Sequence, residues 1–227
     1  LRLKISQKSK LVHINEYLYT EVESDKRKSG EKQFDYVDPK NRQVQIEMEQ
    51  ACTNHLKEIG GYLYPIFRPV DFSSHTFEYE ASVIIPVRNR IRTVKDAVRS
   101  ALNQQTTFPF NVIVIDNHST DGTSEVLHEL SSDKRLIHVI PERDDLGIGG
   151  CWNIGIHHEK CGKFAIQLDS DDLYKDEHTI QKIVDTFYKE SCAMVIGTYL
   201  MTDFHLNEIA PGIIDHKEWT LENGKNN

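Results

Sequence analysis

The sequence lacks any long uninterrupted apolar run, and none of its apolar stretches approaches the length that a helix needs to span a bilayer. It also lacks an excess of positive charge, because 27 lysines and arginines stand against 35 aspartates and glutamates, a formal net charge of −8. Nucleic acid and anionic membrane surfaces are therefore disfavoured as main partners. An anionic substrate would need local help from a metal ion or from helix N-termini.

Cysteine is scarce, and no two cysteines form a C-x-x-C pair. The four are Cys52, Cys151, Cys161 and Cys192. Reduced thiols in a cytoplasmic protein are the simplest interpretation, and we expect at most a peripheral position at the inner face of the cell membrane. The run His157-His158-Glu159 could bind a metal ion, but a solvated helix end is the simpler interpretation.

The 227 residues divide near position 79 into two regions of different character. Residues 1–79 predict an N-terminal extension or linker, which is polar and loop-like at residues 21–33. Apolar residues recur at spacings of three and four across residues 40–59, which predicts one amphipathic helix. Pro39 precedes this helix and Gly60-Gly61 ends it. We expect the extension to be a connector that packs on the domain at residues 80–227.

From residue 80 onward, apolar stretches alternate with amphipathic stretches. The expected strands are 81–87, 111–116, 136–140, 164–169 and 193–200, and the expected helices are 94–102, 122–130, 148–158 and one around 180–187. Thr120 or Asp121 is placed to cap the second of these helices. Continuous apolar strands that alternate with helices predict an α/β fold, with a mostly parallel sheet covered on both faces.

In open parallel sheets, ligands bind beyond the carboxyl ends of the strands. The first four expected strands lead into polar or glycine-rich segments at this edge, and these are residues 86–89, 116–122, 145–150 and 169–172. Each segment alone could be an ordinary turn, in which polar residues and glycine are common. Because four of them converge on one edge of one sheet, the sequence predicts a binding site there.

The segment Asp169-Ser170-Asp171-Asp172 carries the densest charge in the chain. Carboxylates crowded at a strand end repel one another and lose hydration, so they need a cation or several donors to offset their charge. A divalent ion with oxygen ligands, which itself holds phosphates, is the natural candidate. The alternative is an acidic turn that caps the following helix, and the cluster alone leaves the two equally open.

Asp116 and the glycine loop at 145–150 allow two further interpretations. The Asp116 carboxylate could accept a hydrogen bond from a ribose hydroxyl or a base N–H, or it could form an Asx turn with its own loop. The loop could bring a helix N-terminus close to phosphate. However, Trp152 stands where a dinucleotide fingerprint needs its third glycine, which disfavours a Rossmann dehydrogenase.

A phosphatase of the haloacid dehalogenase type is also disfavoured. Leu173 stands where that family's motif needs Thr or Val, and Asp169 follows the fourth expected strand instead of the first.

Three segments, residues 80–89, 114–123 and 167–172, together resemble the family 2 glycosyltransferases, with the motifs in the family's order across about residues 80–205. The resemblance implies the GT-A fold, a Rossmann-like nucleotide-diphosphosugar transferase domain. It implies transfer of a sugar from a nucleotide-diphosphate sugar, with a UDP-sugar favoured, to a carbohydrate or lipid-linked hydroxyl acceptor in polysaccharide biosynthesis. Inversion at the sugar and dependence on Mg²⁺ or Mn²⁺ are implied as well.

The resemblance also implies roles for single residues. Those implied to bind the donor nucleotide are Pro86, Val87, Arg88, Asp116, Asn117, Gly147, Asn153 and Asp169. Within this set, Asp116 would hold the base or ribose, and Asp169 would contact the ribose. Asp171 would bind the metal that bridges the two phosphates, and Asp172 would assist it.

The sequence departs from the family at two places. Trp152 stands where many relatives have arginine. The catalytic base of the family belongs to an acidic motif beyond the fifth strand, which we expect beyond residue 227, so the domain at 80–227 is expected to be truncated. A nucleotide-sugar-binding module without transferase activity of its own is therefore the alternative function. Residues 1–6 resemble the segment that follows the base motif, which predicts a neighbouring glycosyltransferase domain upstream.

Overall fold

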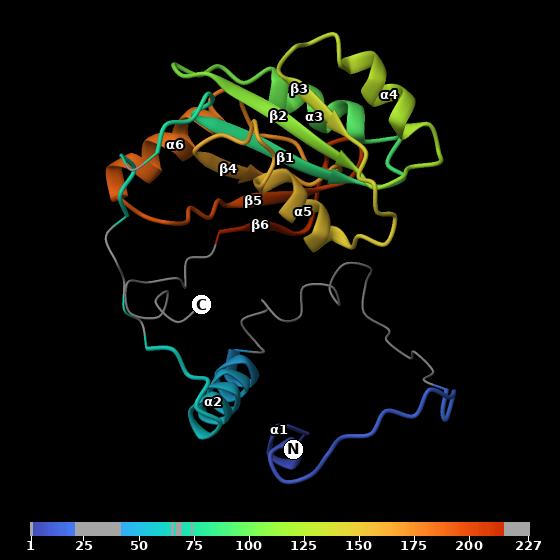
Figure 1. The fold of residues 1–227 in the computed structure, drawn as a ribbon, viewed down its shortest axis with the longest axis vertical. Coiled ribbons are helices and arrows are strands. Elements are labelled where there is room, and N and C mark those ends of the chain that lie inside the picture. Colours follow the sequence, from blue (N-terminus) through green and yellow to red (C-terminus); the bar gives the residue numbers. More distant parts are fainter. Residues whose placement is uncertain (1, 21–41, 65, 67–69, 74, 216–227) are drawn as a thin grey trace. The chain divides into compact units, whose positions relative to one another are not determined.

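The computed structural model describes residues 2–20, 42–64, 66, 70–73 and 75–215 (Figure 1). The chain forms two compact units. One unit comprises residues 68–195, and the other comprises residues 1–67 together with 196–227.

The unit at 68–195 is built on a parallel four-stranded sheet of order β3-β2-β1-β4 (Figure 1). Its strands are β1 (Ala81–Val87), β2 (Phe110–Asp116), β3 (Leu136–Val139) and β4 (Phe164–Gln167). The chain passes outward from β1 to β2 and β3, and then returns to place β4 on the other side of β1. The strand order therefore reverses between β1 and β4, and such a switch point leaves a crevice at the carboxyl ends of the two strands.

Helices cover both faces of this sheet, and they are α3 (Val94–Leu102), α4 (Thr123–Leu130), α5 (Ile148–Ile156) and α6 (Thr179–Glu190). Alternate residues of each strand point to opposite faces. Val83 and Ile85 pack with buried residues of α3, α4 and α6, whereas Ile113 and Ile115 pack with Cys151 of α5. The α/β fold expected from the alternating pattern is confirmed.

Helix α5 approaches the sheet closely at Gly155, where a Cβ atom would lie 2.4 Å from Cγ2 of Ile84. The start of α4 differs in detail from the expected cap. Its N-cap is Gly122 with φ 98°, and Asp121 one position earlier accepts a hydrogen bond from the Thr123 amide at 3.0 Å. Asp121 thus accepts a hydrogen bond from the first turn of the helix, but the N-cap position itself has a left-handed backbone conformation and is occupied by a glycine.

The prediction of a strand at 193–200 is wrong. Residues 193–198 form no strand, and β5 is Tyr199–Thr202, which pairs antiparallel with β6 (Glu208–Ile214) in a separate two-stranded sheet. The apolar run before Gly197 does not pair as a strand, and within residues 193–196 only Val195 packs against the core, as a partly buried residue of an irregular segment. The hairpin turn depends on Asp203, whose Oδ1 accepts hydrogen bonds from the amides of His205 and Asn207.

In the N-terminal part of the other unit, α2 (Arg42–Glu58) confirms the helix expected at 40–59. A short helix, α1 (Arg2–Ser6), precedes Gln7, whose Nε2 donates to Glu58 Oε2 at 2.8 Å. The polar loop expected at 21–33 and Pro39 fall outside the described residues. Packing of the extension on the next domain stays a prediction. Among the residues that the structure describes, no helix is long and apolar enough to cross a membrane.

Candidate functional site

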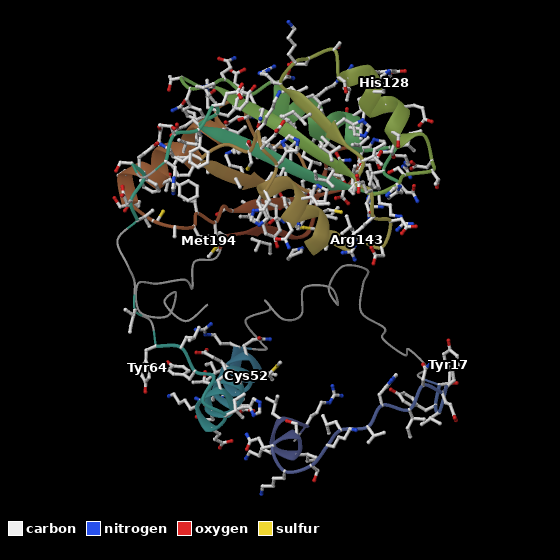
Figure 2. All side chains as sticks on the ribbon, in the orientation of Figure 1. Tyr17, Cys52, Tyr64, His128, Arg143 and Met194 are labelled. Atoms are coloured by element: carbon white, nitrogen blue, oxygen red, sulfur yellow. The ribbon has the colours of Figure 1, made fainter. Side chains whose placement is uncertain are left out.

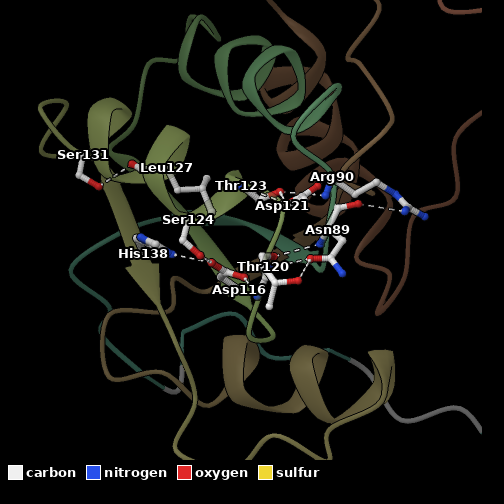
Figure 3. Close-up of polar contacts among 11 residues, drawn as sticks. Asn89, Arg90, Asp116, Thr120, Asp121, Thr123, Ser124, Leu127, Ser131 and His138 are labelled. Carbon is white, nitrogen blue, oxygen red and sulfur yellow. Dashed lines mark hydrogen bonds and ion pairs between the residues drawn. The ribbon is translucent and has the colours of Figure 1, made fainter.

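The loops that follow β1 and β2 are hydrogen-bonded to each other (Figure 3). The Oδ1 atom of Asn89 accepts from the Thr120 amide at 2.8 Å, and the Asn89 amide donates to the Ser119 hydroxyl at 3.0 Å. Asn89 has φ 54°, a left-handed conformation that asparagine adopts more readily than most residues. The two segments expected to converge from the ends of β1 and β2 are therefore in direct contact.

A second set of bonds ties the turn after β1 to the start of α4. The Arg90 amide donates to the buried Thr123 hydroxyl at 2.9 Å, and that hydroxyl donates to Asp121 Oδ1 at 2.6 Å (Figure 3). Asp121 Oδ2 accepts from the Ile91 amide at 3.1 Å. The hydrogen bond from Thr123 is the main reason that the pKa of Asp121 lies below its usual value. The backbone of Arg90 is consequently fixed at this edge of the sheet.

The carboxylate of Asp116 is fully buried at the end of β2. It accepts hydrogen bonds from Ser124 Oγ at 2.5 Å and from the Ser119 amide at 3.0 Å, and His138 Nε2 lies 3.3 Å away (Figure 3). Burial by itself would raise the pKa of Asp116, but bonds from His138, Ser119 and Ser124 outweigh it and lower the pKa. The structure thus gives Asp116 the role of an Asx-type anchor for its own loop, and its contact with a base or ribose stays a prediction.

Asn117, directly after Asp116, ties β2 to the loop that leads into α5. Its Nδ2 donates to the Leu146 carbonyl at 2.5 Å, and its amide donates to the Val87 carbonyl at 2.8 Å. The side-chain Oδ1 is buried and has no hydrogen-bond partner within the described part of the chain. An unpaired acceptor that is buried away from water is costly in free energy.

The loop before α5 is tied to the β2 end at a further point. His118 Nε2 lies 3.1 Å from the Arg143 carbonyl, and the Arg143 guanidinium forms a bidentate pair with Asp145 at 2.8 Å (Arg143 is labelled in Figure 2). This pairing raises the pKa of Arg143 and lowers that of Asp145. The segment expected at 145–150 therefore joins the same edge as the ends of β1 and β2.

The acidic cluster begins where the pairing of β4 with β1 stops. The Leu168 amide still donates to the Ile84 carbonyl at 3.1 Å, and the Asp172 amide then closes a turn onto the Asp169 carbonyl. Arg90 Nε lies 3.9 Å from Asp171 Oδ2, so the cluster meets the loop after β1. The four segments that the sequence placed at one edge are thus joined there.

The acidic turn does not cap the following helix. Helix α6 begins only at Thr179, and its N-cap is His178, so the helix-capping interpretation of Asp169–Asp172 is wrong. Asp176 serves the start of α6 instead, since its Oδ1 accepts from the His178 amide at 3.0 Å. The sequence could not separate the two interpretations because the length of the segment between strand and helix carries no clear signal.

The cluster's charge fits a divalent ion that also carries phosphates. Although the residue Asp172 is exposed, surrounding atoms displace water from its carboxyl group, and this effect raises its pKa, with smaller contributions from the charges of Asp169 and Asp171. Within the described ranges, no three His, Cys, Asp or Glu side chains are grouped to hold a metal by themselves. Magnesium sites at phosphates need only one or two carboxylates, and the rest of the shell is phosphate and water.

The remaining predicted donor-binding residues lie at the same edge or next to it. Pro86 and Val87 are buried in β1, and the Val87 side chain belongs to the core. These two residues can therefore contact a ligand only through their backbone atoms. Arg88 is exposed at the strand end. Gly147 is the N-cap of α5, where an added Cβ would meet no atom within 4 Å, and Asn153 is exposed on that helix. Their contacts with a nucleotide stay predictions.

Sequence reasoning missed the interactions made by two side chains at this edge. The sequence pattern places His138 only within an apolar strand, and its polar side chain inside β3 is the available signal. The ion pair between Arg90 and Asp171 joins distant parts of the chain, and no local pattern could have indicated it. The opposite edge has a hollow of about 440 Å³ that includes His157, but the metal site considered for that run has no supporting cluster within the described residues.

A family model described as "Glycosyl transferase family 2" matches residues 82–225. An uncharacterized glycosyltransferase of Rickettsia felis is 41% identical over 103 residues, which cover 45% of this chain and 16% of that protein. Chondroitin synthase of Pasteurella multocida is 28% identical over 144 residues, which cover 63% of this chain and 14% of that protein.

The matched parts of this chain therefore span less than a fifth of either relative. Among solved structures, S. aureus TarS 1-349 in complex with UDP-GlcNAc is similar with a TM-score of 0.43 and 26% identity, over 48% of this chain and 31% of that one. The family model matches more than half of the chain, in the region that carries the four joined segments. This chain belongs to glycosyl transferase family 2.

Proposed function

We propose that this chain contains the donor-binding part of a metal-dependent, inverting glycosyltransferase, and that the donor is a UDP-sugar. The observation that carries this proposal is the meeting of four loops at the β1–β4 switch point, where an unpaired acceptor and an acidic cluster lie on the same edge. Family membership supports the use of a nucleotide sugar. A phosphatase of the haloacid dehalogenase type has no support from the family match.

The nucleoside is proposed to lie against the ends of β1 and β2. Asn117 Oδ1 would accept an N–H of the base, because it is buried without a partner in the described structure. Pro86, Arg88 and Asp169 would border the base and the ribose. Asp116 would act through its loop, since protein donors already surround its carboxylate. The diphosphate would then lie between the acidic cluster and the start of α5 at Gly147.

Asp171 and Asp172 are the residues that we propose hold Mg²⁺ or Mn²⁺. A divalent ion bound there would neutralise the charge that develops on the departing nucleoside diphosphate. The crowding of carboxylates beside a single weak ion pair supports this assignment. Inversion would require a separate carboxylate to deprotonate the acceptor hydroxyl, and we assign that role to no residue of this chain.

The acceptor is proposed to be a carbohydrate or a lipid-linked carbohydrate. Similarity to a protein named chondroitin synthase supports polysaccharide assembly as the setting. Residues 1–79 would connect the donor-binding domain to a neighbouring glycosyltransferase domain of a longer protein. The alternative is a module that binds the donor but transfers no sugar. This alternative needs a test because the matched residues cover only a small part of each relative.

Calorimetric titration of UDP, UDP-sugars and GDP-sugars, with and without Mn²⁺, tests the proposal. We expect UDP binding that requires Mn²⁺, loss of the metal requirement and most of the affinity in Asp171→Ala, and about tenfold weaker binding in Asn117→Ala. Asp144→Ala, at an exposed position on the nearby loop, is the matched control. Undiminished Mn²⁺-dependent binding by Asp171→Ala would remove the metal assignment. Binding without sugar transfer, in this chain and in the longer protein, would favour the module.

A further inference from the structure

Arg90 stands opposite the acidic cluster across the β1–β4 switch point. Its Nε lies 3.9 Å from Asp171 Oδ2, and the side chains of the two residues are 51% and 52% exposed. An exposed pair at this separation is screened by water and contributes little to stability. The pair is therefore easy to open, and it contributes little to holding the fold.

The backbone of Arg90 is held much more firmly than its side chain. Its amide donates to the buried hydroxyl of Thr123 at 2.9 Å, and the preceding Asn89 is fixed by bonds to Ser119 and Thr120. Among the described residues, the guanidinium makes a long contact of 3.4 Å to the Asn89 carbonyl besides the pair with Asp171. Because the backbone is fixed and the long side chain is exposed, the guanidinium can change partners without any movement of the sheet.

The chemistry of the two partners makes such an exchange favourable. A divalent ion and a guanidinium compete for the same Asp171 oxygen, because both are cations at one carboxylate. Arginine keeps its charge, and its planar fork matches phosphate oxygens in a bidentate way. When Asp171 holds a metal that carries a diphosphate, the released guanidinium lies beside a new anion of suitable geometry.

We propose that Arg90 is a donor-binding residue that neutralises Asp171 before the donor and the metal bind, and that transfers to the donor diphosphate when a metal ion takes its place. This inference rests on the proposed function, because it needs a nucleotide diphosphate at the acidic cluster. It assigns to Arg90 two opposing effects: it weakens binding of the metal alone, and it strengthens binding of the nucleotide that comes with the metal.

Because Arg90 is proposed to weaken metal binding and to strengthen nucleotide binding, its removal should change the two affinities in opposite directions. A merely structural role of Arg90 would not produce this result. In Arg90→Gln, we expect Mn²⁺ alone to bind about two- to fivefold more tightly, because its competitor is gone. We expect UDP in the presence of saturating Mn²⁺ to bind about tenfold more weakly, because a charge-assisted contact is lost. Arg90→Lys keeps the charge but not the fork, so metal binding should stay near wild type while UDP affinity recovers only in part.

The measurements use the whole chain. Electron paramagnetic resonance of free Mn²⁺ follows metal binding without nucleotide, and calorimetry follows UDP at fixed Mn²⁺. Arg99→Gln, which removes the same charge from an exposed position on α3, is the matched control and should change neither affinity. Thermal unfolding of each variant checks that the fold is kept.

Two outcomes would overturn the inference. If Arg90→Gln leaves both affinities unchanged, the ion pair has no role in binding; if it weakens both with the fold intact, Arg90 acts only as local support. Either result leaves the proposed function standing, because wild-type protein still binds UDP with Mn²⁺. Failure of the wild-type protein to bind UDP with Mn²⁺ would instead remove the proposed function and this inference together.

Discussion

His138 Nε2 lies 3.3 Å from Asp116 Oδ2, and this contact joins the edge strand β3 to the end of β2 at the candidate site (Figure 3). The same carboxylate oxygen receives the Ser124 hydroxyl from α4. Asp116 is thus a buried anion held by donors from three elements, because its remaining bond comes from the Ser119 amide of its own loop. The loop that carries Asn117 is fixed by these contacts before any ligand binds.

Replacing Asp116 with asparagine should destabilise the protein. The amide presents a donor where the carboxylate accepted, so the Ser124 hydroxyl or His138 loses its partner. We expect a loss of about 1–3 kcal/mol in the free energy of unfolding, measured by urea denaturation at neutral pH. Asp144→Asn, at an exposed position, is the control and should stay within about 0.5 kcal/mol of wild type. Equal stability of the two variants would contradict the anchoring role.

The pKa of Asp116 also predicts how stability depends on pH. Because its pKa is lower in the folded than in the unfolded chain, the carboxylate stabilises the fold above its unfolded pKa, near 3.8, and this contribution is lost as pH falls through the folded value. Asp176, whose pKa is lowered to about 2 mainly by Lys182, acts in the same direction.

Urea denaturation at several pH values measures this dependence. The unfolding free energy should lose little between about pH 7 and pH 5 from these groups, and should fall steeply below about pH 4. Asp116→Asn should show a shallower fall, since it has no carboxylate to protonate at that position. An identical acid slope in wild type and variant would show that Asp116 does not supply the effect.

Gly155 should tolerate no side chain. A Cβ there would lie 2.4 Å from Ile84 Cγ2, so α5 or the sheet would have to shift. We expect Gly155→Ala to lower the unfolding free energy by about 1–3 kcal/mol. Gly149 in the same helix is the matched control, because its Cβ would meet no atom within 4 Å. Gly149→Ala should be neutral or stabilising by up to about 1 kcal/mol, and the reverse order of the two variants in thermal unfolding would refute the packing argument.

Ser82 is predicted to hold the start of β4 through a buried polar network. Its hydroxyl donates to Asn111 Oδ1 at 2.5 Å and accepts from the Gly162 amide at 2.7 Å. Ser82→Ala leaves both groups buried without that partner, so we expect a loss of about 1–3 kcal/mol in chemical denaturation. Ser131→Ala, which removes a hydroxyl from an exposed residue, serves as comparison and should change little. A neutral Ser82→Ala would mean that water replaces the hydroxyl.

Much of the fold could be predicted because its local patterns are strong. The strands β1 and β2 are continuous apolar runs, and α3 and α6 carry their apolar residues at helical spacing. Apolar content misled at 193–198, where the chain forms no strand and only Val195 is partly buried. A short apolar run does not by itself distinguish a strand from an irregular segment, so the sequence could not separate the two.

The sequence by itself determined the order of strands and helices from β1 to α6, the family, and the positions of the polar strand ends, because these depend on local spacing and on motifs in one order. Only the tertiary structure decided which of those polar groups meet. The return of the chain places β4 beside β1, and this brings Arg90 to Asp171, while the parallel register brings His138 to Asp116. Such contacts join residues far apart along the chain, and local patterns carry no information about which distant partner a polar side chain will face.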